Sequence, residues 1–500
     1  MSDILQYCRP EEVGIHPSWI EEYVNTVNEN RKMSHSFVML RGGKVFAEGY
    51  WKPFHKDWKH RMYSASKSFV SAAIGMLADE GKIRLDDKII DYFPDMIPEG
   101  GAHPWVAATT IRHMLMMATC NNGTVYIPEE NHWLDAFFNP TRTPAAEPGT
   151  RFFYDTSATY TLCVLVERIT GMPFLEYLKD KALRELGFSE DAWCIEAPDG
   201  YSWGGSGVVC TNRDLARFAM LFANGGNVAG RQYISREYVE AATSKQIENS
   251  NIFEEKDVCK GHGYGYQIWR IRDGYAFMGM GCQLALFVPK KDLIFTCNSF
   301  TLVEPDLHDL YYRVAEYFFD KIADRVDADT DSIPMDDGAY RRLEAVLSGL
   351  ELSTPEGEIS SPMAEKVNGK EYILGENRMG MHSFRIEFHG SAGLLSYRTD
   401  RGDKHFPFCL GRYADTFLPE THYSGKRINT PKDAPYRCLN IAVWTAPDTL
   451  LLRTYVIDDY FGSMDARFTF AEDRVILHIT KEAEWYLNEY PGYAEGQAQK

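Results

Sequence analysis

Apolar and polar residues follow two different patterns along the chain, and the change falls near residue 325. Before it, apolar residues recur with the 3.6-residue period of a helix in several stretches. The predicted helices span residues 11–30, 64–81, 110–118, 157–187, 212–225, 236–245 and 305–324. Residues 36–50 predict a hairpin, and residues 264–299 predict three strands, because their apolar residues alternate or run together between turns. Residues 121–150 show little period and predict a long loop.

The segment that follows residue 325 suits a domain boundary. Residues 325–337 contain five aspartates and a proline, and a helix is predicted over 338–350. The later part of the chain is typical of short strands separated by turns, such as 384–388, 394–397, 439–445, 449–457, 466–470 and 474–479. Regularly spaced short strands predict a closed or nearly closed β-barrel or a sandwich. We therefore expect a first domain at 1–325, a linker with a short helix at 326–357 and a β domain at 358–500.

Composition and charge exclude several classes of protein. The 500 residues are 44% hydrophobic and 25% charged, which indicates a folded globular protein of two or three domains. The net charge of −18 repels a phosphate backbone, so nucleic acid is not an expected partner. No apolar run approaches the ~18 residues of a membrane span, so we expect no membrane partner either.

The cysteines and the first residues bear on the compartment. The ten cysteines are scattered, with no Cys-x-x-Cys pair, which favours buried free thiols over disulfides or a zinc site. The chain begins without a basic stretch followed by an apolar core, so no signal peptide is predicted. A cytoplasmic location fits both observations. No cofactor or metal motif is present.

The strongest chemical signal is a Ser-x-x-Lys sequence at the start of the helix predicted over 64–81. Ser64 and Lys67 are three residues apart, so they share one face of the first helical turn. The positive field of the helix N-terminus and burial both lower the pKa of a lysine placed there. A partly deprotonated Lys67 can then take the proton of the Ser64 hydroxyl, which makes Ser64 a candidate nucleophile. The alternative is a serine that only caps the helix.

Motifs elsewhere in the first 325 residues strengthen the interpretation of Ser64 as a catalytic nucleophile. They are Thr110–Leu115, Glu147–Tyr154, Gly204–Val208 and Arg213–Phe218. Together with the Ser-x-x-Lys sequence, residues 10–325 resemble the serine β-lactamase and DD-peptidase superfamily. Within it they are most similar to the class C-like branch that includes the family VIII esterases and the 6-aminohexanoate-dimer hydrolases.

The resemblance implies an α+β fold. The first domain would be an antiparallel sheet flanked by helices, with an additional all-helical subdomain. The C-terminal all-β domain would be a lipocalin-like barrel, which could shape the mouth of the active site, support a homodimer or stabilise the fold. The resemblance also implies a small-molecule substrate.

The family's second motif, Tyr-x-Asn, reads Tyr154-Asp155-Thr156 here. The tyrosine is retained, and a neighbouring ammonium can lower the pKa of its phenol. Tyr154 would then act as a general base or relay the proton to the leaving group. Thr156 replaces the asparagine, which removes an amide donor from the expected pocket.

The family's third motif, Lys/His-Thr/Ser-Gly, is altered. We align Gly279 with the motif glycine, which places Phe277 at the cationic position and Met278 at the hydroxyl position. A register that ends on Gly281 also keeps a glycine. In the first register the oxyanion hole would be the backbone N–H groups of Ser64 and Met280. Phe277 and Gly279 would line the pocket.

Three aromatic residues complete the expected pocket, namely Tyr126, Trp133 and Trp203, each with a core or surface position as its alternative. The intact serine, lysine and tyrosine predict a serine hydrolase that cleaves an ester or a small amide through an acyl-enzyme. Because the cation of the third motif is missing, little or no β-lactamase activity is expected. The alternatives are a binding or regulatory protein on a decayed hydrolase scaffold, and a D-aminopeptidase-like or β-lactamase-like enzyme.

Overall fold

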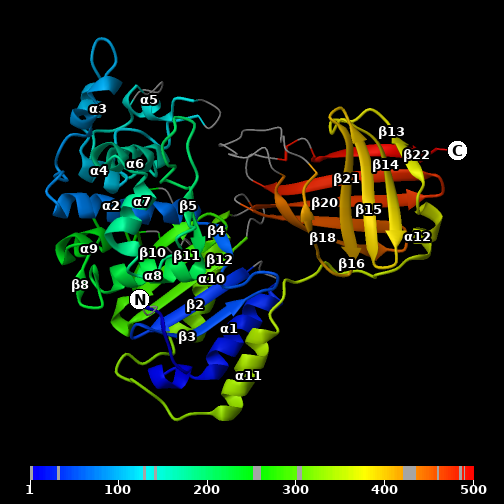
Figure 1. Ribbon diagram of the computed structural model, residues 1–500, viewed down its shortest axis with the longest axis horizontal. Coiled ribbons are helices and arrows are strands. Elements are labelled where there is room, and N and C mark those ends of the chain that lie inside the picture. Colours follow the sequence, from blue (N-terminus) through cyan, green and yellow to red (C-terminus); the bar gives the residue numbers. More distant parts are fainter. Residues whose placement is uncertain are drawn as a thin grey trace. The chain divides into compact units, whose positions relative to one another are not determined.

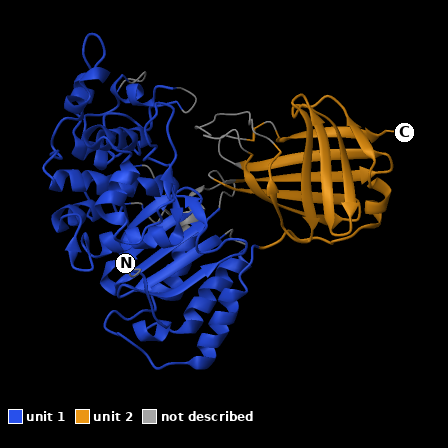
Figure 2. Ribbon diagram, viewed as in Figure 1, with its two compact units in different colours: residues 1–352 blue, residues 353–500 orange. Residues whose placement is uncertain are grey.

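The chain is described here from a computed structural model. It covers residues 4–30, 34–127, 131–139, 144–251, 259, 261–300, 307–419, 435–458, 461–483, 487–488 and 490–499. The chain forms two compact units, Met1–Leu352 and Ser353–Lys500 (Figure 2). The first unit combines helices and sheets, and the second is a β-barrel with one short helix (Figure 1).

A seven-stranded sheet forms the centre of the first unit. In spatial order its strands are β1 (Gln6–Tyr7), β3 (Lys44–Tyr50), β2 (Ser34–Arg41), β12 (Leu293–Ser299), β11 (Gln283–Val288), β10 (Gly274–Gly279) and β9 (Trp269–Ile271). All neighbouring strands are antiparallel except β1 and β3. The predicted hairpin is β2–β3, and the three predicted strands are β10, β11 and β12. Strands β2, β11 and β12 are buried along their whole length, as expected for a sheet with both faces covered.

Helices cover both faces of this sheet. The α-helices of the first unit are α1 (Pro17–Glu29), α2 (Ser66–Asp79), α3 (Pro104–Ala108), α4 (Ile111–Leu115), α5 (Trp133–Phe138), α6 (Thr156–Thr170), α7 (Phe174–Leu178), α8 (Asn212–Ala223), α9 (Arg236–Thr243), α10 (Leu307–Phe318) and α11 (Asp337–Ser348). On one face, Tyr23 of α1 and Phe318 of α10 contact Phe295 of β12. On the other, Phe218 of α8 contacts Phe277 of β10. Within the described residues, no helix combines the length and apolar character needed to cross a membrane.

Shorter elements connect these layers. They are the helical turns η1 (Pro10–Val13), η2 (Tyr63–Ala65), η3 (Ile89–Tyr92), η4 (Pro94–Met96), η5 (Lys179–Leu183), η6 (Pro289–Lys291) and η7 (Phe319–Ala323). The small sheets contain β4 (Lys59–Arg61), β6 (Val208–Thr211) and β5 (Trp193–Cys194), and the pair β7 (Asn227–Val228) and β8 (Arg231–Gln232). The segment 121–150, expected to be a loop, contains the helix α5.

Helix α2 runs through the middle of the first unit, with 12 of its 14 residues buried. Small residues allow its neighbours to approach closely. A Cβ on Gly75 would lie 2.7 Å from the ring of Tyr238, and a Cβ on Gly204 would lie 2.6 Å from the side chain of Val70. Any larger residue at either glycine would therefore push a neighbour away from α2.

The segment expected to be a linker, 326–357, belongs largely to the first unit. The buried guanidinium of Arg41 donates hydrogen bonds to the carbonyl oxygens of Asp327, at 2.8 Å, and Thr330, at 2.9 Å. Helix α11 then packs against α1. The boundary between the compact units consequently falls after Leu352, and the helix predicted within the linker is part of the first unit. The aspartate-rich composition did not reveal this because the contacts use backbone carbonyls.

The second unit is a closed barrel. Its strands are β13 (Glu371–Leu374), β14 (Met381–His389), β15 (Ala392–Thr399), β16 (Gly402–Leu410), β17 (Ala414–Phe417), β18 (Arg437–Ala446), β19 (Thr449–Ile457), β20 (Phe461–Ala471), β21 (Arg474–Ala483) and β22 (Gly492–Ala498), with one helix, α12 (Pro362–Val367). Neighbouring strands are antiparallel around the ring, and a parallel pairing of β16 with β18 through Cys409 and Ile441 closes it. Nine strands form the ring; within the described residues, β17 pairs with β18 alone and lies outside the ring.

Side chains fill the barrel. Tyr372, Phe384 and Phe468 form a row of ring contacts with centroid distances of 5.2 and 4.9 Å. The cavity described in the interior measures about 20 Å³ and is lined by Thr454 among apolar residues. This volume is about that of one water molecule. The barrel core is therefore a packed hydrophobic core.

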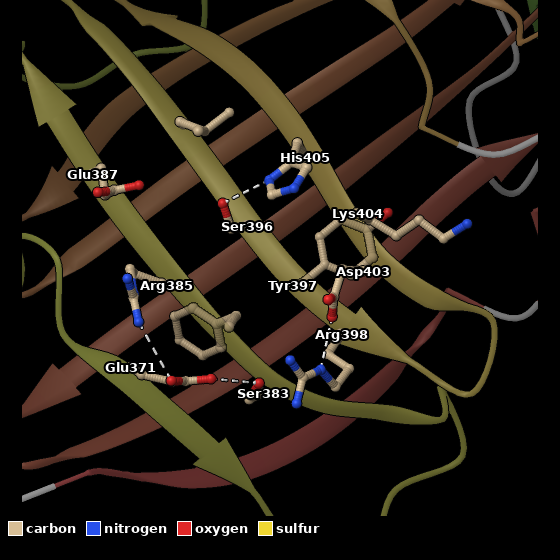
Figure 3. Close-up of a pocket in the computed structure, with 12 residues that line it drawn as sticks. Glu371, Ser383, Arg385, Glu387, Ser396, Tyr397, Arg398, Asp403, Lys404 and His405 are labelled. Carbon is tan, nitrogen blue, oxygen red and sulfur yellow. Dashed lines mark hydrogen bonds and ion pairs between the residues drawn. The ribbon is translucent and has the colours of Figure 1, made fainter.

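The outer face of the barrel carries a hollow of about 310 Å³ across β13–β16 (Figure 3). Four of its charged side chains form two ion pairs. Arg398 binds Asp403 at 2.7 Å, and Arg385 binds Glu371 at 3.4 Å. Exposed pairs of this kind contribute little to stability.

Candidate active site

Ser64 lies where strand β4 turns into helix α2. The turn is η2, and the backbone of Tyr63 adopts a φ of 47°, in the left-handed region. A bulky residue rarely adopts this conformation, and such strained residues gather at functional sites. Both neighbours of Ser64 are buried, whereas Ser64 itself is partly exposed. The turn therefore presents the hydroxyl group at the surface of the core.

Lys67 lies one helical turn after Ser64 and points back at it. Its Nζ is 3.0 Å from the Oγ of Ser64 and 2.7 Å from the carbonyl oxygen of Gly205, and the residue is 1% exposed. The pKa of Lys67 is lowered to about 7, chiefly by burial; Asp155 opposes the shift, and the positive charge of Arg61 contributes to it. Near neutral pH much of Lys67 is therefore an uncharged amine that can accept a proton.

A second buried cation, Arg61, lies directly before the nucleophile turn. Its guanidinium lies over the rings of Tyr63 and Trp203, at 4.2 and 4.5 Å. Its Nε donates a hydrogen bond to the carbonyl oxygen of Ser206 at 2.9 Å. Arg61 was not among the site residues predicted from the sequence. The available signal was a basic residue three positions before the candidate nucleophile.

Tyr154 lies beside both groups. Its ring centroid is 5.0 Å from the Nζ of Lys67, and its ring stacks on Trp269. Burial raises the pKa of Tyr154 above the ordinary value for tyrosine. The expectation of a lowered pKa was wrong, because burial raises the pKa by more than the interaction with the Ser64 hydroxyl lowers it. Tyr154 is therefore a protonated phenol, suited to donating and relaying a proton.

The residues after Tyr154 start helix α6. Asp155 caps the helix, because its carboxylate accepts hydrogen bonds from the backbone N–H groups of Ser157, at 2.9 Å, and Ala158, at 3.3 Å. The methyl group of Thr156 packs against Gly205, since a Cβ on that glycine would lie 2.6 Å from it. The altered second motif thus contacts the peptide whose carbonyl binds the lysine.

Strand β10 brings the altered third motif against the nucleophile turn. A Cβ on Gly279 would lie 2.1 Å from the carbonyl oxygen of Met62 and 3.1 Å from the backbone nitrogen of Ala65. Only glycine fits at this position. The contact favours the register with the motif glycine at 279 over the one at Gly281. It also places Met280, the next residue, beside the turn that carries Ser64.

Phe277 belongs to the core and not to the pocket. It is fully buried, and the rings of Phe218, Phe222 and Phe287 surround it with centroids at 5.5, 5.2 and 5.0 Å. The prediction that Phe277 lines the pocket is therefore wrong. The alternation of strand β10 directs this side chain towards α8.

Two methionines, Met278 near the end of β10 and Met280 just after it, lie close to Phe277 in the sequence. Met278 is partly exposed, and its Sδ lies 3.4 Å from the Sγ of Cys259. Met280 is also partly exposed. Met278 stands at the hydroxyl position of the family's third motif, and Met280 follows the motif glycine. Among the described residues, no group of three His, Cys, Asp or Glu residues could hold a metal ion.

The three predicted pocket aromatics form one cluster. Tyr126 and Trp133 stack at 4.2 Å, and the Nε1 of Trp203 donates a hydrogen bond to the hydroxyl of Tyr126 at 3.2 Å. All three side chains are buried, Trp133 fully, which agrees with the alternative of core positions. Trp203 is connected to the nucleophile turn through the guanidinium of Arg61.

All ten cysteines are free thiols, as predicted, and eight of them are buried. Burial raises the pKa of several of these thiols, including Cys163 and Cys210, well above the ordinary value. They are therefore uncharged thiols that pack as small apolar groups.

A seven-stranded sheet between helical layers, with a Ser-x-x-Lys turn against its strand β10, defines the class of β-lactamase and transpeptidase-like proteins. The Beta-lactamase family model matches residues 25–317, so the chain belongs to the Beta-lactamase family. The superfamily and the α+β fold with a C-terminal barrel, both expected from the sequence, are thereby confirmed.

Individual relatives agree with this assignment. A 6-aminohexanoate-dimer hydrolase from Paenarthrobacter ureafaciens is 29% identical over 221 residues, which cover 41% of this chain and 56% of that protein. Penicillin-binding protein 4* from Bacillus subtilis is 20% identical over 195 residues, covering 34% and 40%. The chain thus spans only about half the length of the curated relatives it matches. A solved structure of a β-lactamase candidate from Bacteroides dorei shares the fold, with a TM-score of 0.50, 17% identity and coverage of 61% and 97%.

Proposed function

We propose that this protein is a serine hydrolase that cleaves an ester or a small amide through an acyl-enzyme on Ser64. The observation that carries the proposal is the Nζ of Lys67, buried at 3.0 Å from the Oγ of Ser64 with a pKa of about 7. A lysine kept in this state has little structural use, because burying a cation opposes folding. It is suited to activating a hydroxyl nucleophile.

The reaction follows from the positions of three side chains. Neutral Lys67 accepts the proton of Ser64 while the Oγ attacks the substrate carbonyl. Backbone N–H groups of Ser64 and Met280 hold the oxyanion of the tetrahedral intermediate. Tyr154 donates its proton to the leaving group and recovers one from the Lys67 ammonium. Water then attacks the acyl-enzyme; its proton passes through the same groups, and Ser64 is released with its proton restored.

The surroundings of the site bear on the substrate. Met278 provides apolar surface where the family pattern has a hydroxyl, and the cationic position is taken by the buried Phe277. An uncharged acyl group therefore fits better than one with a carboxylate. The relative named 6-aminohexanoate-dimer hydrolase supports the amide alternative. Weak or absent β-lactamase activity is part of the proposal.

Labelling with a fluorophosphonate probe tests the proposal. We expect the adduct on the peptide that contains Ser64, and complete loss of labelling in Ser64→Ala. Ser68→Ala is a matched control, because Ser68 is a buried serine on the same helix whose hydroxyl binds the carbonyl oxygen of Gln267. A screen of p-nitrophenyl esters, amino-acid amides and nitrocefin then identifies the substrate class.

Two outcomes contradict the proposal. Labelling at another residue would show that Ser64 is not the nucleophile. Absence of both labelling and turnover would favour the binding or regulatory protein. The observation that favours this second candidate is the third motif, where Phe277 is part of the core and supplies no group to the site.

A further inference from the structure

We propose that Gln283 is a positioning residue that holds the oxyanion-binding N–H of Met280 in place. The inference rests on the proposed function and names a residue that the reaction scheme above does not use. Gln283 is the first residue of β11 and is fully buried. It touches no substrate; it acts through the loop that connects β10 with β11.

The side-chain amide of Gln283 both donates and accepts hydrogen bonds. Its Nε2 donates hydrogen bonds to the carbonyl oxygen of Met280, at 3.3 Å, and to that of Ser299, at 2.6 Å. Its Oε1 accepts a hydrogen bond from the Nδ2 of Asn298 at 2.9 Å. Two donors and an acceptor are thus satisfied, which fixes the orientation of the amide.

The connecting loop requires such support. It consists of three residues, Met280, Gly281 and Cys282, between paired strands. Gly281 has a φ of 73° and Cys282 a φ of 70°. The second value is unfavourable for a residue with a side chain, and such a conformation persists only where its surroundings hold it. The bond from Gln283 to Met280 is a contact that holds this loop from inside the sheet.

The N–H of Met280 is therefore fixed between two points. On one side, Gly279 packs against the carbonyl oxygen of Met62 in the nucleophile turn. On the other side, Gln283 holds the carbonyl oxygen of Met280. With both ends of the segment held, rotation of the peptide that carries the N–H is restricted. A preorganised donor stabilises the oxyanion without reorganisation during the reaction.

The amide is itself anchored in the centre of the first unit. Asn298 of β12 also accepts a hydrogen bond from Ser36 of β2 at 3.5 Å, and Asn212 of α8 donates to the Ser36 hydroxyl at 3.1 Å. These side chains are 0–2% exposed. A buried polar chain thus connects the start of α8 to the loop beside Ser64. An apolar side chain at position 283 would fill the same volume. The presence of a buried glutamine is explained if its hydrogen bonds hold the loop at Met280.

The test compares Gln283→Met with Gln267→Met. Gln267 is a matched control, because it is also a buried glutamine whose Nε2 donates to two backbone carbonyls, those of Met114 and Leu115. Both variants lose the same kind of hydrogen bonds, so we expect a similar fall in melting temperature. Only Gln283→Met should lower kcat for a p-nitrophenyl ester, by about tenfold with KM nearly unchanged, less than the ~100- to 1,000-fold effect of deleting an oxyanion donor.

The specific measurement is the rate ratio between an oxo ester and its thiono analogue. Sulfur is larger than oxygen and accepts hydrogen bonds poorly, so a well-placed oxyanion hole discriminates against the thiono ester. We expect this ratio to fall in Gln283→Met and to stay at the wild-type value in Gln267→Met. If Gln283→Met does not fold, Gln283→Asn keeps an amide that is one methylene too short to reach Met280, and the same fall in the ratio is expected.

The failures can be told apart. A wild-type protein labelled at Ser64, with an unchanged ratio in the folded Gln283 variant, would overturn the inference alone. Equal losses of kcat in Gln283→Met and Gln267→Met would also overturn it. A wild-type protein that is neither labelled at Ser64 nor able to hydrolyse esters would overturn the proposed function, and the inference with it.

Discussion

The two compact units bury very different side chains. Among the described residues, the barrel buries three polar residues, Ser383, Asn440 and Thr454, whereas the first unit buries 30 polar or charged ones. Those of the first unit include Lys67 and Arg61, two cations within one short segment. A buried cation opposes folding unless it is paired or kept neutral. The first unit therefore buries charge that opposes folding, whereas the barrel core is almost entirely apolar.

The strongest test of this contrast is Lys67→Met. We expect hydrolysis and labelling to fall by about 100- to 10,000-fold, the range for loss of a general base. In the wild-type protein, kcat/KM should rise with pH through about 7, because only the neutral amine accepts the serine proton. Retention of that pH dependence in Lys67→Met would exclude Lys67 as its source.

The same variant should alter stability in a defined pH window. The pKa of Lys67 is about 7 in the folded protein and near 10.5 in the unfolded chain. The unfolded chain therefore binds more protons between these values, and the penalty for burying Lys67 is complete below pH 7 and disappears towards pH 10.5. Lys67→Met should be more stable than the wild type at pH 6, with the difference shrinking at high pH. Denaturant unfolding at several pH values measures this.

A smaller effect is expected from Arg61→Gln. Removing this positive charge raises the pKa of Lys67, so the acidic limb of kcat/KM should move to higher pH. The loss of activity should be largest at pH 6 and small at pH 9. Arg61→Lys keeps the charge and should shift the profile less. A profile that stays in place in Arg61→Gln, in a protein that still folds, would remove Arg61 from the electrostatics of the site.

The smallest effect on activity is expected from the barrel. Phe468 is 1% exposed and contacts Phe384 at 4.9 Å, so Phe468→Ala should cost about 3–5 kcal/mol of stability. Its kcat should equal that of the wild type at temperatures where the barrel remains folded. A large loss of kcat in the folded variant would contradict the contrast between the units.

Local features of the fold were predictable from sequence. Helix α8 begins at Asn212, where the prediction begins, because Thr211 and Asp214 form a capping box. The closeness of Ser64 and Lys67 also follows from spacing, since three residues make nearly one helical turn. Segments outside the predicted strands, such as β13 and β22, have short or polar-rich sequences with little alternation.

Features that depend on distant segments were not predictable. The sequence did not show on which face of the sheet the Phe277 side chain lies. Strand β10 is buried on both faces, so apolar and polar residues do not alternate along it. The direction of the Tyr154 pKa depended on burial between Trp269 and the nucleophile turn. The place of residues 327–330 in the first unit depended on Arg41, almost 300 residues earlier in the chain.

The sequence alone determined the family, the nucleophile candidate and the division into a mixed first part and a β-rich last part. These rest on neighbours along the chain, where spacing dictates which side chains meet. Only the tertiary structure decided the electrostatics: a lysine with a pKa near 7, a tyrosine that stays protonated and a glutamine that holds the loop beside the serine. Each depends on how much water the fold excludes and on which distant groups it brings together. The spacing of residues along the chain determines neither the burial nor these long-range contacts.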